Sequence, residues 1–226
     1  MLASDPQVIE NQPFEAYLKH HSLSRSVLWH MRASPWHYHQ ALLNPDEEVT
    51  EAMLMGGALH ARVLEPEDFD RRYWVCPLPP RPEGDGRTKA VKDARAAWDA
   101  DMAAFQETVP SHATVLTEQQ FERVESMATG LRALPQFHAA MATDPRIETT
   151  ILWDDVGTEL ALKARLDIWT RDSNVVLDVK TSSDASPAAF ARSCARYGYH
   201  LQDAMYTAAV TEATGNDPGP VVFLVV

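Results

Sequence analysis

The sequence predicts an α/β fold in which a central mixed β-sheet is flanked by helices and the N-terminal half is helical. Two stretches predict the sheet: apolar and polar side chains alternate over residues 159–169, and a run rich in β-branched residues follows at 175–180 after a polar turn. Residues 88–107 instead carry apolar side chains at helical spacing. At 226 residues, of which 45% are hydrophobic, the chain is long enough to bury a sizeable core.

Proline and capping residues mark where the helices begin and end. Pro66 restricts the residue before it, so the helix that starts near residue 51 is expected to end at Leu64. Pro35 separates two shorter helices, and Thr117 is an expected N-cap. The expected helices are 24–33, 36–43, 51–64, 88–107, 118–133 and 199–214, with strands between 149 and 179 and at 221–226. The apolar stripe of the fourth helix, expected to pack in the core rather than stack on bases, is Val91, Ala94, Trp98, Met102 and Phe105.

The chain is expected to form one domain over residues 21–226, preceded by an extended arm over residues 1–20. The apolar run at 221–226 stops without a polar exit, so we expect the domain to be truncated at its C-terminus. No apolar run approaches the roughly 20 residues that a membrane span needs, and residues 1–6 lack the basic and apolar regions of a signal peptide. The expected location is the cytoplasm, with no membrane partner.

The segment from Asp167 to Lys180 is typical of a β-hairpin that carries two carboxylates and a lysine at one end. Side chains alternate along a strand, so Asp178 and Lys180 point to one face while Val179 points to the core. If the strands pair about the turn, Asp167 lies close to Asp178, and two nearby carboxylates favour Mg²⁺ or Mn²⁺ between them. A neighbouring lysine can hold an attacking water or stabilise a phosphate, which suits phosphodiester hydrolysis. The alternative is a surface strand with a salt-bridged Asp and Lys.

Two expected helices carry further polar candidates. Gly56 and Gly57 each cost about 1 kcal/mol inside a helix, so another backbone or a ligand is expected to approach there, close to His60. Taken alone, His60 fits a core histidine better than a metal ligand. Gln202 and Tyr206 are four residues apart on the last expected helix and share one face, where they either line a cleft or pack at the helix surface.

The net charge of −12 argues against DNA binding, which normally rests on lysines and arginines that displace counterions. The local distribution differs, because basic residues gather at 19–32 and at 81–95. Either cluster can face a phosphate backbone while the acidic excess lies elsewhere. In the second cluster Asp93 and Asp99 interleave with the basic residues, so a solvated helix face is the alternative there.

Several motifs occur in a fixed order along the chain. They are Leu23-Ser24-Arg25-Ser26, Ser34-Pro35-Trp36-His37-Tyr38, Gly56-Gly57-Ala58-Leu59-His60 running to Leu64-Glu65-Pro66, Arg87-Thr88-Lys89, Lys163 to Asp167, Asp178-Val179-Lys180-Thr181, and Gln202 with Tyr206. In this order and spacing, the sequence from residue 20 to the end resembles the RecE-type exonuclease VIII family of phage and prophage recombination. That family is part of the PD-(D/E)xK superfamily, which also holds the RecB-like nuclease domains, and it implies a restriction-endonuclease-like core.

The resemblance implies roles for individual residues. The implied side-chain metal ligands are His60, Asp167 and Asp178, with the backbone carbonyl of Val179 completing the shell. Lys180 is the implied catalytic lysine, Gln202 and Tyr206 match a Q-x-x-x-Y helix motif, and Glu65 matches an accessory acidic residue five places after the histidine. We expect DNA contacts from Arg25, Arg87, Lys89 and Arg165. The expected cofactor is Mg²⁺, for which Mn²⁺ can substitute.

The resemblance also implies an activity, a metal-dependent and ATP-independent exodeoxyribonuclease that degrades linear double-stranded DNA from 5′ to 3′. The remaining 3′ single strand would pass to a single-strand annealing protein, and the enzyme would form a ring-shaped homo-oligomer. One alternative is a RecB-like nuclease acting on single-stranded or flap DNA. Another is a non-catalytic module that binds DNA ends, although such a module has no need of paired carboxylates beside a lysine.

Overall fold

The computed structural model describes residues 5–43 and 49–226, and the chain divides into two compact units. The first unit comprises residues 1–54 and 130–226, and the second comprises residues 55–129. The larger of the two β-sheets lies in the first unit. Within the described ranges, no helix combines the length and the apolar character needed to cross a bilayer.

The first unit is built on a five-stranded mixed sheet with the strand order β1-β4-β5-β6-β7. β6 and β7 run parallel, whereas the other neighbouring strands are antiparallel. Its strands are β1 (Gln7–Ile9), β4 (Arg146–Asp155), β5 (Leu160–Trp169), β6 (Val176–Lys180) and β7 (Val222–Val225), and its helices include α1 (Phe14–Lys19), α2 (Arg25–Leu28), the 3₁₀ helix Trp29–Arg32, α3 (Pro35–Leu43), α8 (Pro135–Met141), α9 (Pro187–Tyr197) and α10 (Tyr199–Thr214). This sheet with flanking helices is the mixed α/β architecture that the sequence predicts.

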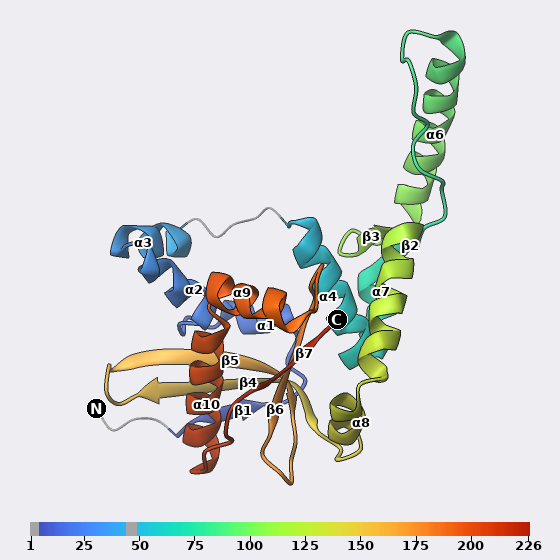
Figure 1. Cartoon of the computed structure of the whole chain (residues 1–226). Coiled ribbons are helices and arrows are strands. Elements are labelled where there is room, and N and C mark those ends of the chain that lie inside the picture. Colours follow the sequence, from blue (N-terminus) through green and yellow to red (C-terminus); the bar gives the residue numbers. More distant parts are fainter. Residues whose placement is uncertain (1–4, 44–48) are drawn as a thin grey trace. The chain divides into compact units, whose positions relative to one another are not determined.

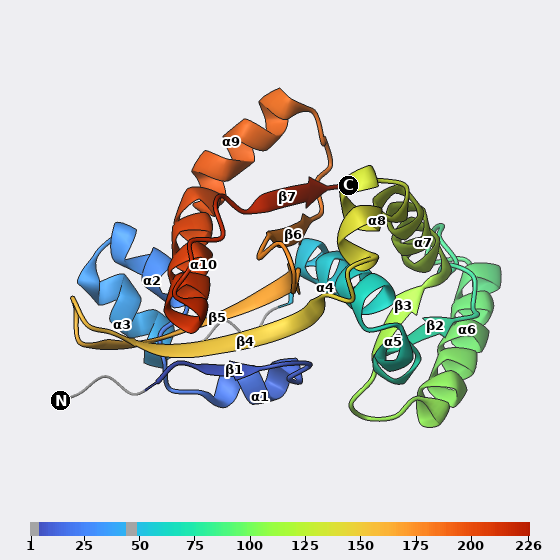
Figure 2. The same ribbon diagram turned by 90° about the horizontal axis from the view of Figure 1, so that it is seen from below.

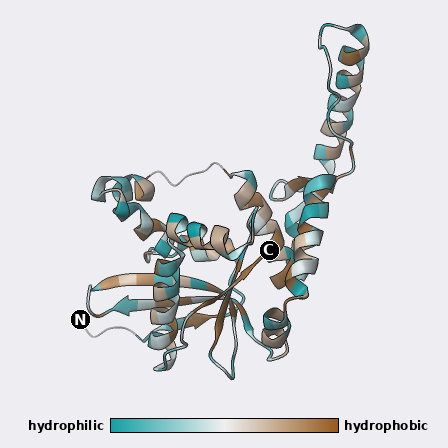
Figure 3. Cartoon of the chain, in the orientation of Figure 1, coloured by the Kyte–Doolittle hydropathy of each residue, from teal (hydrophilic) through white to brown (hydrophobic). Residues whose placement is uncertain are grey.

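The antiparallel pair β4 and β5 supplies one apolar face of the sheet. Its register places Ile151 opposite Ala164, and both side chains belong to a buried cluster with Trp153. Helix α10 lies across β4 and β5 (Figure 1) and contributes Ala209 and Val210 to the same cluster. Strands β6 and β7 are also coloured as largely hydrophobic in Figure 3. A fully buried aliphatic or aromatic side chain stabilises the fold by about 1.5–3 kcal/mol, so the packing of α10 residues against β4 and β5 holds this helix on the sheet.

Strand β5 also fastens the N-terminal elements. Lys163 is 6% exposed, and its Nζ donates to the carbonyl oxygens of Tyr17 at 3.0 Å and His20 at 2.8 Å. The last carbonyls of a helix have no partner inside it and favour a cation, so Lys163 caps the C-terminal end of α1. An extended arm is the sequence prediction for residues 1–20, but the described part of that span contains the paired strand β1 and the helix α1.

The second unit contains a two-stranded parallel sheet. Its elements are α4 (Glu51–Leu64, from Met55 onward), α5 (Pro66–Arg72), β2 (Tyr73–Cys76), α6 (Lys89–Thr108), β3 (Thr114–Thr117) and α7 (Glu118–Arg132, as far as Thr129). Parallel strands need a crossover connection, which α6 and its preceding loop provide between β2 and β3. A Cβ added at Gly57 would lie 3.1 Å from the Tyr73 hydroxyl, so a side chain approaches this part of α4 where the sequence predicts a backbone or a ligand.

Helix α6 differs from its prediction, because none of its residues is buried. Two residues of its apolar stripe, Val91 and Trp98, lie instead against the loop that precedes the helix. Trp98 Nε1 donates to the carbonyl of Pro79 at 2.7 Å, and Arg95 Nε donates to that of Pro82 at 3.0 Å. Helical spacing predicts which side chains share a face, but it cannot show whether a core or a loop packs against that face.

Gly198 links α9 to α10 and has a φ of +69°, a left-handed conformation that favours glycine. A Cβ at this position would lie 2.3 Å from a ring carbon of Trp29. We expect Gly198→Ala to lower the free energy of unfolding by roughly 2–5 kcal/mol, since about 1–2 kcal/mol of backbone strain adds to about 1–3 kcal/mol of overpacking. Urea unfolding measures this loss.

The matched control is Gly215→Ala, because Gly215 has a similar φ of +73° and no heavy atom within 4 Å of an added Cβ. This variant should lose only the part due to backbone strain, about 1–2 kcal/mol. Equal losses at the two glycines would show that the Trp29 ring moves aside without cost.

Burial raises the pKa of the Tyr17 hydroxyl to about 12. Because the ordinary value is about 10, the folded protein holds this proton more tightly than the unfolded chain does. The contribution to stability is therefore complete below about pH 10 and is lost as the pH rises from about 10 to about 12. We expect Tyr17→Phe to reduce the alkaline loss of stability, measured by urea unfolding between about pH 8 and 11. Tyr197→Phe, at an exposed side chain, is the control, and an alkaline loss unchanged by Tyr17→Phe would contradict the expectation.

Candidate active site

The candidate site lies where β5 and β6 part. The two strands pair at Ile168–Leu177 and Trp169–Val176. One residue further along, Asp167 Oδ2 accepts a hydrogen bond of 2.7 Å from the backbone N–H of Val179, and this bond is buried. The Asp167 side chain thus joins the strands where their backbone pairing ends. The sequence predicts that Asp167 lies close to Asp178, and in the structure Asp167 bonds to the backbone of Val179, the next residue along β6.

Asp178 and Lys180 form an ion pair on β6, as expected for residues two apart on one strand. Asp178 is 1% exposed, and the Lys180 Nζ also lies 4.9 Å from the ring centroid of Tyr199. Burial favours the neutral amine, but the carboxylates of Asp178 and Asp167 outweigh burial and raise the pKa of Lys180 above its usual value. Lys180 is therefore a half-buried cation held against carboxylates.

Gln202 of α10 connects this pair to the helices, a contact that the sequence does not predict. Its Nε2 donates to Asp178 Oδ1 at 2.6 Å and to the Tyr206 hydroxyl at 2.8 Å. Its Oε1 accepts from Arg25 Nη2 at 3.2 Å. A guanidinium only donates and a carboxylate only accepts, so these partners fix which way the amide points. Burial raises the pKa of Tyr206 well above its usual value, so this phenol stays neutral.

Glu148 is a buried carboxylate at this site that the sequence analysis does not identify. It is 5% exposed, and its Oε2 accepts a hydrogen bond of 2.6 Å from Arg165 Nε. One of its carboxylate oxygens lies within 4.8 Å of one from Asp167. The signal for this residue is the hairpin register, which places position 148 opposite 167, but the strand was expected to begin only at residue 149.

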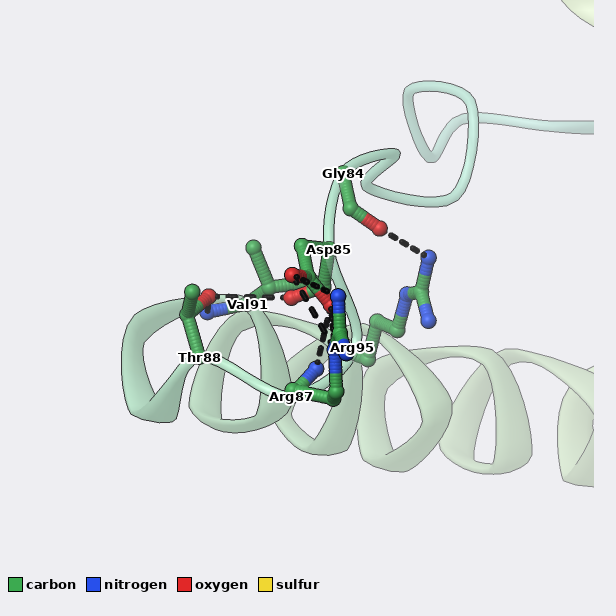
Figure 4. A network of polar contacts seen from close by, with 6 residues as sticks. All are labelled: Gly84, Asp85, Arg87, Thr88, Val91 and Arg95. Carbon is green, nitrogen blue, oxygen red and sulfur yellow. Dashed lines mark hydrogen bonds and ion pairs between the residues drawn. The ribbon is translucent and has the colours of Figure 1, made fainter.

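The four arginines and lysines expected to contact DNA occupy different environments. Arg165 is 9% exposed, and its guanidinium also donates to the Gln12 carbonyl, so Arg165 is engaged within the fold. Arg25 donates to the Tyr197 carbonyl as well as to Gln202. Arg87 and Lys89 are exposed in the second unit, where Arg87 pairs with Asp85 beside the start of α6 (Figure 4).

Two further candidates belong to the second unit. His60 lies on α4 and is half-buried between the buried residues Leu59 and Ala61. Glu65 follows the end of α4 and forms an ion pair with Arg72, with 3.0 Å between Glu65 Oε2 and Arg72 Nη1. The accessory role of Glu65 therefore remains a prediction for a carboxylate that already has a structural partner.

The donors in the first unit suit a divalent cation. Asp167, Asp178 and Glu148 are buried carboxylates, and oxygen ligands of this kind are those that Mg²⁺ and Mn²⁺ prefer. Burying carboxylates near one another is unfavourable unless cations balance them. Lys180 and Arg165 each pair with one of the three. A bound divalent cation would offset the remaining negative charge.

We expect Gln202→Leu to lower the free energy of unfolding by about 2–3 kcal/mol, because a buried carboxylate loses a hydrogen bond and Arg25 loses an acceptor. Urea unfolding measures the loss. Gln106→Leu, which exchanges the same side chains at an exposed position of α6, is the control and should change stability by less than about 0.5 kcal/mol. Equal effects of the two substitutions would contradict a structural role for the Gln202 network.

A search of curated proteins finds no match to this chain. A family model described as a PDDEXK-like domain of unknown function (DUF3799) matches residues 24–226. The match covers most of the chain and includes every element of the candidate site described above. It supports the PD-(D/E)xK nuclease superfamily, and with it a hydrolase acting on nucleic acid that uses a divalent metal. The chain is a member of the PDDEXK-like DUF3799 family.

Proposed function

We propose that this protein is a metal-dependent exodeoxyribonuclease that hydrolyses phosphodiester bonds from the ends of linear double-stranded DNA. The observation that carries the proposal is the ion pair on β6 between the buried Asp178 and the half-buried Lys180, beside an Asp167 that is bonded to the same strand. A structural ion pair has no need of a second carboxylate at its side. Together with the family match, this arrangement favours phosphodiester hydrolysis.

In the proposed site, Asp167 and Asp178 would hold the divalent cation, which is Mg²⁺ with Mn²⁺ as a substitute. The cation supplies Lewis-acid stabilisation of the phosphate and lowers the pKa of a bound water. His60 and the backbone carbonyl of Val179 are further ligands proposed from the sequence resemblance. The hydrogen bond from the Val179 N–H orients the Asp167 carboxylate, which supports its proposed role as a ligand.

The other polar groups have proposed roles of holding and orienting. Lys180 presents a cation beside Asp178, where it can orient the attacking water or stabilise charge that develops on the phosphate. Gln202 holds Asp178 in place, and both Arg25 and Tyr206 hold Gln202. We assign Gln202 and Tyr206 to positioning the catalytic carboxylate, which gives the Q-x-x-x-Y motif a physical role.

The substrate and direction of digestion rest on the resemblance to RecE-type nucleases. We propose 5′ to 3′ digestion of duplex DNA, without ATP, that leaves a 3′ single strand for an annealing protein in recombination. A ring-shaped homo-oligomer and a cytoplasmic location belong to the same proposal. Arg25, Arg87 and Lys89 are the proposed DNA contacts, whereas the burial of Arg165 favours a role inside the site. A RecB-like nuclease that prefers single-stranded or flap ends would use the same carboxylates.

Digestion of end-labelled linear duplex tests this proposal. With Mg²⁺, we expect the 5′ label to be released as mononucleotide, no release in EDTA, and a loss of at least about 10²–10³-fold in rate for Asp178→Asn and for Lys180→Ala. His60→Ala is expected to weaken activity and metal dependence together. Asp172→Asn, at an exposed position in the turn between β5 and β6, is the matched control and should keep full activity.

The same assay separates the alternatives. Release of the 3′ label first would reverse the proposed polarity, and faster digestion of single-stranded or flap ends would favour the RecB-like nuclease. If the folded protein binds DNA ends but releases no label with either metal, a non-catalytic end-binding module replaces the proposal.

A further inference from the structure

Glu148 has an unusual backbone conformation for a strand residue. The β4–β5 register pairs Ile147 with Ile168 and Thr149 with Leu166, which places Glu148 opposite Asp167. Yet Glu148 has a φ of +44°, a left-handed conformation in the middle of a strand. For a residue with a Cβ, this conformation costs about 1–2 kcal/mol, and it persists only where surrounding contacts require it. The contacts that hold this conformation are those of the Glu148 side chain.

The Glu148 carboxylate is buried next to another carboxylate. Glu148 and Asp167 are 5% and 6% exposed, and each contributes an oxygen to a pair separated by no more than 4.8 Å. Like charges at this range repel strongly where water is excluded. Arg165 balances Glu148 through a hydrogen bond of 2.6 Å, but its guanidinium approaches through Nε and also donates to the Gln12 carbonyl. The arginine is thus fixed at both ends of its planar group.

We propose that Glu148 is a further ligand of the divalent cation and that Arg165 is a positioning residue that orients its carboxylate. This inference rests on the proposed function and adds a third carboxylate from β4 to Asp167 of β5 and Asp178 of β6. Arg165 donates to Glu148 Oε2 at 2.6 Å and so fixes the orientation of the carboxylate that we assign to the cation. The left-handed backbone at Glu148 is then a cost that the metal site and the arginine together offset.

A purely structural role for Glu148 makes a different prediction. If the residue only neutralised Arg165, its removal would destabilise the fold but leave the affinity for metal unchanged. The test is therefore metal binding itself, measured by calorimetric titration of the metal-free, full-length protein with Mn²⁺. DNA is not added, so the readout does not depend on activity.

We expect Glu148→Gln to weaken Mn²⁺ binding by at least about tenfold, as removal of a ligand or of its immediate support does. Glu159→Gln is the matched control, because Glu159 lies at the far end of the same hairpin, also with a positive φ of +58°, but is exposed. Its affinity for Mn²⁺ should equal that of the wild type. An unchanged affinity in folded Glu148→Gln would overturn the inference.

Glu148→Gln leaves the buried Arg165 cation without its carboxylate partner, so the variant risks misfolding. Arg165→Gln and the double variant Glu148→Gln/Arg165→Gln provide a second comparison in which the two states differ only at position 148. The double variant should bind Mn²⁺ at least about tenfold more weakly than Arg165→Gln. Equal affinities would overturn the inference even if the single variant fails to fold.

Failure of this inference is distinguishable from failure of the proposed function. If Asp178→Asn abolishes Mn²⁺ binding while Glu148→Gln does not weaken it, only the role of Glu148 is wrong. If the folded wild-type protein binds neither Mn²⁺ nor Mg²⁺, the metal-dependent function falls together with this ligand.

Discussion

The candidate site depends on burying several carboxylates at one end of a sheet. An isolated buried carboxylate is strongly unfavourable, so each one here requires a partner: Asp167 has a backbone N–H, Asp178 has Lys180 and Gln202, and Glu148 has Arg165. These partners come from β5, β6 and α10, and they meet only when the sheet and the helix are assembled. The need to pair each buried carboxylate therefore ties β4, β5, β6 and α10 of the first unit together.

The local sequence was sufficient to predict the parts of the site that lie close together along the chain. Alternation and β-branched residues located β5 and β6, so Asp167, Asp178 and Lys180 were placed together, and a four-residue spacing placed Gln202 and Tyr206 on one face of α10. Glu148 was missed because its relation to Asp167 depends on the register of a long hairpin. The stripe on α6 was expected in the core, but a neighbouring loop covers it, and helical periodicity is the same in both cases.

The N-terminal segment is a further case in which contacts distant in sequence decide the structure. Residues 7–19 carry no sequence signal for the elements they form, because a strand of three residues and a helix of six are too short for a clear pattern of apolar spacing. β1 pairs with β4, whereas side chains of β5 hold the segment that follows, with Lys163 capping α1 and Arg165 donating to the Gln12 carbonyl. These cations are 143 and 153 residues away from their carbonyl partners at His20 and Gln12. The sequence of β5 shows Lys163 and Arg165 on one face of the strand, but it does not indicate which backbone carbonyls accept their hydrogen bonds.

The position of β6 within the sheet affects how the chain folds during its synthesis. β6 lies between β5 and β7, and the parallel partner β7 follows only after α9 and α10 (Figure 2). At about 5–20 residues per second, a ribosome needs a few seconds to add that connection, during which one edge of the strand that carries Asp178 and Lys180 has no neighbour. The candidate site is therefore assembled only late in synthesis, because Gln202 on α10 and the second neighbour of β6 both follow the strand that carries the carboxylate.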